Sequence, residues 1–97
     1  MSVTCCAFND FVKAMDDETR QCILSLLQAG ELNVTDIVAH TAVVQPTVSH
    51  HLALLRHAHL VLARREGRNI FYRINPTCIA EGCSEIQARF NICRQET

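Results

Sequence analysis

Six cysteines are the residues of this 97-residue chain best suited to chemistry. Cys5 and Cys6 are adjacent near the start of the chain, and Cys78, Cys83 and Cys93 lie near its end. Thiolates bind soft ions in preference to hard cations. Two adjacent sulfurs, with a third from the C-terminal segment, suit an ion of three-coordinate geometry such as As(III). The pattern therefore predicts a site for As(III) or another soft metal ion, formed by Cys5 and Cys6 with Cys93, Cys83 or Cys78.

The sequence leaves other roles open for these thiols. Two thiols of a reduced protein can form a disulfide under oxidative or sulfur stress, so a redox sensor is the main alternative. Cys83 and Cys93 also lie on the apolar stripe of the expected last helix, where a cysteine can serve as a small buried hydrophobe. Cys78 lies about a right angle off that stripe, so burial explains it less well.

Composition indicates a small protein that stays in the cytoplasm. About half of the residues are hydrophobic (48%), but no apolar run approaches the roughly 18 residues that span a bilayer. The start of the chain also lacks the features of a secretory signal. We therefore expect reduced thiols and no membrane partner. A chain of this length forms one small domain, residues 1–97, of modest stability, so dimerisation is expected as well.

Charge is unevenly distributed along the chain, although the net charge is only −1. Residues 1–44 carry six acidic and two basic side chains, whereas residues 45–75 carry five arginines and one glutamate, a net charge of +4. A contiguous basic third predicts a surface that meets phosphates. A solvated charged hairpin would have the same composition, so charge alone does not separate the two interpretations.

The apolar periodicity predicts a mainly α fold with a β-hairpin that acts as a wing. Asp17, Asn33 and Asn75 are placed to cap the helices that follow them, and Gly67 suits the turn of the hairpin. The expected helices cover residues 6–15, 17–30, 34–41, 45–59 and 75–95, and the expected hairpin covers residues 60–75.

The third and fourth expected helices form a helix-turn-helix, because a short helix and a tight turn precede a helix that opens with small polar residues. The second helix of such a pair presents its N-terminal side chains to the major groove. The hairpin that follows adds arginines on a protrusion, as in a wing that follows the phosphate backbone. The predicted contacts with double-stranded DNA are Gln45, Thr47, Ser49, His50 and Arg56 from the helix, and Arg64, Arg65 and Arg68 from the wing.

Three stretches of the chain resemble the ArsR/SmtB family of winged-helix repressors. They are "DDETRQCILSLLQAGELNVTDI", "QPTVSHHLALLRHAHLV" and "RREGRNIFYRI", which resemble the family's second helix with its entry into the third, its recognition helix and its wing. The resemblance implies a winged helix-turn-helix homodimer that pairs through its first and last helices. It also implies binding to a palindromic operator and repression of nearby genes until an inducer releases the protein.

The chain departs from the family pattern at two of the family's sensing sites. Asn33 and Thr35 stand where one class of arsenic sensors carries cysteines, and the last helix contains neither the His nor the Asp of the zinc and nickel sites. The turn before the recognition helix also lacks the usual glycine. These departures leave Cys5, Cys6 and the last-helix cysteines as the expected inducer ligands. A thiol-rich metal-binding protein without a DNA role is the alternative from another class, and no motif indicates an enzyme.

Overall fold

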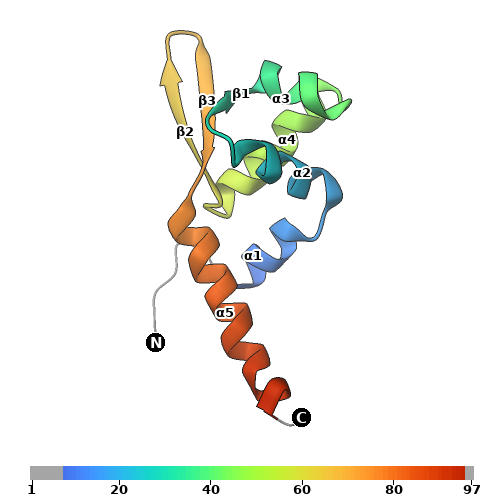
Figure 1. Cartoon of the computed structure of the whole chain (residues 1–97). Coiled ribbons are helices and arrows are strands. Elements are labelled where there is room, and N and C mark those ends of the chain that lie inside the picture. Colours follow the sequence, from blue (N-terminus) through green and yellow to red (C-terminus); the bar gives the residue numbers. More distant parts are fainter. Residues whose placement is uncertain (1–7, 96–97) are drawn as a thin grey trace.

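The computed structural model describes residues 8–95, with side chains up to residue 89. Within that range the chain forms a winged helix-turn-helix, which confirms the predicted mainly α fold with a β-hairpin wing (Figure 1). The part of the first helix predicted before Phe8 lies outside the described residues. The elements are α1 (Phe8–Met15), α2 (Glu18–Leu27), β1 (Leu32–Asn33), α3 (Val34–Thr41), α4 (Gln45–His57), β2 (Val61–Glu66), β3 (Asn69–Ile74) and α5 (Pro76–Gln95).

Short-range signals fix the starts of the helices. The carboxylate of Asp17 accepts a hydrogen bond from the backbone N–H of Arg20 at 3.0 Å, and the Asn33 side chain accepts one from the N–H of Asp36 at 2.8 Å. Both predicted N-caps are confirmed, and each satisfies a backbone donor that has no partner within the helix. Asn75 directly precedes α5, and its amide donates to the carbonyl of His59 at 2.9 Å. This bond ties the start of α5 to the end of α4.

One apolar core lies beneath α4, and residues at helical spacing in α2 and α4 contribute to it. Val48, Leu52 and Leu55 of α4 are fully buried, so the opposite side of that helix is left to polar residues. The other buried members come from α1, α2, α3, α5, the segment between α4 and β2, and the first residue of β2: Phe11, Ala14, Ile23, Leu24, Leu27, Ile37, Ala58, Leu60, Val61 and Cys78.

The turn between α3 and α4 keeps its geometry without a glycine. Ala42 takes the left-handed conformation itself, with φ 58° and ψ 21°. The Thr41 hydroxyl accepts a hydrogen bond from the N–H of Val43 at 3.3 Å, which helps to hold the chain in the turn. A side chain in the left-handed region costs about 1 kcal/mol, so the sequence carries a small strain where the family usually has glycine.

The wing belongs to a three-stranded antiparallel sheet in the order β1-β3-β2. Gly67, with φ 62°, opens the two-residue turn between Glu66 and Asn69, as predicted. Strand β1 was not predicted, because its two residues show no periodicity of their own. Leu32 pairs with Tyr72 and Asn33 with Phe71, so β1 exists through its pairing with β3.

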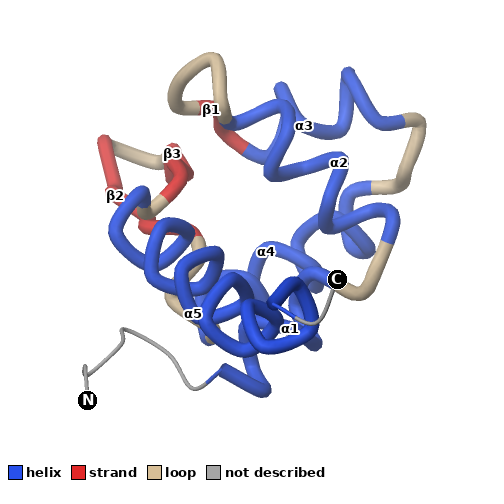
Figure 2. Tube along the Cα trace, turned by 60° about the horizontal axis from the view of Figure 1, so that its bottom comes forward, coloured by secondary structure: helices blue, strands red, loops and turns tan. Residues whose placement is uncertain are grey.

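Helices α1 and α5 lie side by side, on the side of the molecule away from α3 (Figure 2). Gly82 of α5 is buried against the ring of Phe11, which is itself only 2% exposed. A Cβ at Gly82 would overlap three carbon atoms of that ring. The glycine therefore sets how closely α1 approaches α5. No helix within the described residues is both long and apolar enough to cross a membrane.

Candidate nucleic-acid interface

The polar residues predicted to contact DNA from α4 are all exposed. Pro46 lies in the first turn of α4, where a missing N–H costs nothing. The inward row of α4 anchors the helix in the core, so its outer side chains remain available to a partner. The exposed predicted contacts are Gln45, Thr47, Ser49, His50 and Arg56.

A hollow of about 390 Å³ separates α4 from the wing. Ser49 and Arg56, one and three turns into α4, lie along it, and Tyr72 of β3 faces them from the sheet. The phenol of Tyr72 adds a hydroxyl donor and acceptor between two predicted contacts. Tyr72 was not among the predicted contacts, because the alternation of side chains along β3 indicates which side of the strand Tyr72 occupies but not that α4 lies opposite.

The wing arginines divide into two kinds. Arg64 is held by carboxylates: its Nε and Nη2 donate to Glu31 at 2.8–3.1 Å, and its Nη1 donates to Glu66 at 3.0 Å. Its guanidinium also lies over the ring of Phe71, 5.0 Å from the centroid. Arg65 and Arg68 are exposed and make no side-chain hydrogen bond or ion pair with any other described residue.

The carboxylate of Glu31 joins the wing to the segment before α3. The hydrogen bond from Arg64, followed by the charges of Arg64 and Arg73, holds the pKa of Glu31 below its ordinary value, although partial burial opposes this shift. Arg73 lies 3.9 Å from the same carboxylate. The positive charges of Arg64 and Arg73 are thus balanced by the negative charges of Glu31 and Glu66. The unbalanced positive charge of the wing resides on Arg65 and Arg68.

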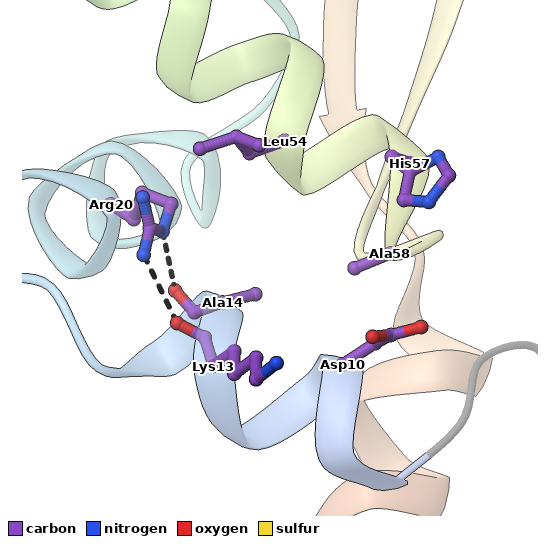
Figure 3. Close-up of a pocket in the computed structure, with 7 residues that line it drawn as sticks. All are labelled: Asp10, Lys13, Ala14, Arg20, Leu54, His57 and Ala58. Carbon is purple, nitrogen blue, oxygen red and sulfur yellow. Dashed lines mark hydrogen bonds between the residues drawn. The ribbon is translucent and has the colours of Figure 1, made fainter.

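Arg20 of α2 connects this helix to α1 (Figure 3), and it also contacts α4. Its Nε donates to the carbonyl of Ala14 at 2.9 Å and its Nη2 to that of Lys13 at 3.0 Å, so it satisfies the last carbonyls of α1. Its Nη1 lies 3.1 Å from Nδ1 of His51 in α4. Because a guanidinium only donates, Nδ1 of His51 accepts this bond and carries no proton. His51 is thereby fixed on the inner side of α4, next to the exposed His50.

The described thiols do not form a ligand cluster among themselves. Cys22 and Cys83 are exposed, whereas Cys78 is only 1% exposed and belongs to the core. The expectation that burial explains Cys78 poorly was wrong, because the first turn of α5 contributes Cys78 to the same buried cluster as Leu60 and Val61. Cys5, Cys6 and the side chain of Cys93 lie outside the described residues. Within those residues no three His, Cys, Asp or Glu side chains are grouped to hold a metal ion.

Comparison with known proteins finds transcriptional regulators that are similar to most of this chain. The sequence profile described as "Bacterial regulatory protein, arsR family" matches residues 17–62. The chain is 37% identical over 73 residues to the transcriptional repressor SdpR of Bacillus subtilis, covering 75% of this chain and 81% of that protein. It is 40% identical over 85 residues to the arsenical resistance operon repressor of Escherichia coli, covering 87% and 72%.

Solved structures agree with these sequence matches. A possible transcriptional regulator for arsenical resistance superposes with a TM-score of 0.78 at 30% identity, over 84% of both chains. Reduced HlyU from Vibrio cholerae superposes with a TM-score of 0.69 at 32% identity, over 87% of this chain and 85% of that one. The chain belongs to the ArsR/SmtB family of winged-helix, DNA-binding transcriptional regulators, which are not enzymes.

Proposed function

We propose that this protein is a homodimeric repressor that leaves its operator when cysteine thiolates bind As(III) or another soft metal ion. The observation that carries the DNA-binding part is the helix α4, whose apolar row is fully buried while its polar contacts face outward beside a wing. The relatives that regulate arsenical resistance support As(III) as the inducer to test first.

The α5 thiols differ in their suitability as the third ligand beside Cys5 and Cys6. Cys83 is exposed on α5 and reaches a ligand without any change in the core. Cys78 is 1% exposed and would reach one only if the first turn of α5 left the core. We therefore place Cys83 ahead of Cys78. A ligand held between the N-terminal cysteines and α5 would act on the surface through which the family pairs.

The proposed dimer uses α1 and α5. Val12 of α1 is 43% exposed, and in the proposed dimer a second copy would cover this apolar side chain. Cys83 lies on α5 in the part of the molecule that would join this surface. Binding of one ion between two subunits would shift one recognition helix relative to the other, and a palindromic operator would then fit only one of the two arrangements.

A release assay tests this proposal. A duplex selected by the protein from a random-sequence library serves as the operator, and fluorescence anisotropy follows its release as sodium arsenite is added. The variant with both Cys5→Ser and Cys6→Ser should bind the duplex normally and no longer respond to arsenite. Cys22→Ser, which removes an exposed thiol from α2, is the matched control and should respond like the original protein. Continued release of the double variant would contradict the proposal.

Redox sensing is the second candidate, and the similarity to reduced HlyU favours testing it. Release by peroxide or persulfide but not by arsenite, with a disulfide found by mass spectrometry, would assign the thiols to this chemistry. A protein that binds no duplex even at low salt would instead be a thiol-rich metal-binding protein without a DNA role, because nonspecific affinity is greatest under those conditions.

A further inference from the structure

Val44 is the most exposed large apolar side chain of the described residues, with 66% of its surface accessible. The other two in this class have apolar neighbours or a proposed partner surface: Leu54 lines the hollow between α4 and α1 (Figure 3), and Val12 lies on α1. Val44 stands instead at the entrance of α4, beside the exposed Gln45 and Thr47. Its side chain therefore projects from the part of α4 that approaches DNA first.

The same residue breaks a local rule of helix formation. Val44 is the N-cap of α4 and makes no side-chain hydrogen bond there. Its backbone is that of an ordinary N-cap, with φ −68° and ψ 154°, and its carbonyl accepts from Thr47 and Val48 at 3.1 Å each. Ser, Thr, Asp or Asn would fit this geometry and satisfy a further donor, whereas valine is among the poorest N-caps. Departures of this kind concentrate where a side chain serves function rather than folding.

The chemistry of the major groove supplies a partner for an exposed valine. Base edges there present hydrogen-bond donors and acceptors, which Gln45, Thr47 and Ser49 can read, and one apolar group, the C5 methyl of thymine. We propose that Val44 reads a thymine in each operator half-site by packing against this methyl. The proposal rests on the placement of α4 in the major groove and adds a specificity-determining residue to it.

Substitution of single thymines by deoxyuridine tests the contact, because only the methyl is removed. In the selected operator duplex, replacing one particular thymine in each half-site should weaken the affinity of the protein for the duplex about fourfold. This is the effect expected from the loss of one buried methyl group. For Val44→Ser the thymine and deoxyuridine duplexes should bind equally. Val44→Ser should also melt at a higher temperature than the original protein, since serine caps α4, so lost discrimination would not reflect unfolding.

Two comparisons complete the experiment. Ser49→Ala should weaken binding of both duplexes and keep the ratio between them, because its hydroxyl does not contact a methyl. Two results would overturn this inference and leave DNA binding intact. One is that Val44→Ser discriminates between the thymine and deoxyuridine duplexes by the same affinity ratio as the original protein, and the other is that deoxyuridine has no effect on binding by the original protein. A protein that binds no duplex at all would overturn the proposed function together with this inference.

Discussion

Replacing Gly82 by alanine should destabilise the protein, although alanine is the better helix former. Gly82 is buried where α5 meets α1, and an added Cβ would overlap three ring carbons of Phe11. The ring is 2% exposed, so it has no open space into which it can turn. The substitution must therefore push α1 away from α5 or force the ring out of its preferred rotamer.

The size of the effect follows from two opposed contributions. Overpacking a core costs about 1–3 kcal/mol, and overlap with three ring atoms places Gly82→Ala near the upper end of this range. Replacing glycine within a helix recovers about 1 kcal/mol. We expect a net loss of about 2 kcal/mol in the free energy of unfolding. In a Phe11→Leu background, which removes the ring, the same change should be neutral or stabilise by up to about 1 kcal/mol.

Urea unfolding followed by circular dichroism measures these differences, at one fixed protein concentration because the stability of a dimer depends on it. Ala80→Gly, at an exposed position of α5, measures the helix-propensity contribution alone and is the matched control. If Gly82→Ala is neutral or stabilising in the original background, or if its effect is the same with Phe11→Leu, then the close approach of α1 and α5 does not depend on Gly82.

Three further expectations concern the turn, a cap and the wing. Ala42→Gly should raise the free energy of unfolding by about 0.5–1 kcal/mol by relieving the left-handed alanine, and a lowered melting temperature would contradict this. Asp17 has its pKa lowered, first of all by the N–H of Arg20, so its stabilising effect is present above about pH 4 and is lost as pH falls through the folded-state pKa. Asp17→Asn should keep the cap and weaken the acid dependence of unfolding, and an unchanged pH profile would count against this role. Arg65→Ala should reduce the slope of the logarithm of the DNA-binding constant against the logarithm of the salt concentration by about 0.9 for each phosphate contact that is lost. Arg64→Ala should mainly lower the melting temperature, because Arg64 is paired with Glu31 and Glu66. Equal slope changes in the two variants would mean that Arg64 leaves its carboxylates to bind phosphate.

The features that could be predicted from sequence are those whose causes lie within a few residues. The caps Asp17 and Asn33 act on a donor three residues away, and Gly67 supplies the positive φ that its own turn requires. The apolar row of α4 repeats at helical spacing, and its burial followed as predicted. Each of these could be recognised without knowledge of what packs against it.

The features that could not be predicted depend on partners far along the chain. Strand β1 forms because Leu32 meets Tyr72, 40 residues away, and Arg64 is held by Glu31, 33 residues away. The helical wheel placed Cys78 beside the polar side of α5, but its burial depends on where the core lies and not on the stripe of that helix. The role of Gly82 could not be predicted either, since nothing in α5 itself indicates the ring of Phe11.

The arrangement of α1 also bears on how a signal at the proposed thiol site could reach DNA. Helix α1 packs on α5 through Phe11 and Gly82, and its last carbonyls bind the guanidinium of Arg20. The remaining nitrogen of that guanidinium, Nη1, is hydrogen-bonded to His51, which lies on the inner side of the helix that carries the predicted DNA contacts. A guanidinium is planar and rigid, so its three hydrogen bonds cannot adjust independently of one another. A displacement of α1 relative to α4 would strain or break one of these three bonds, so Arg20 couples the position of α1 to that of the recognition helix.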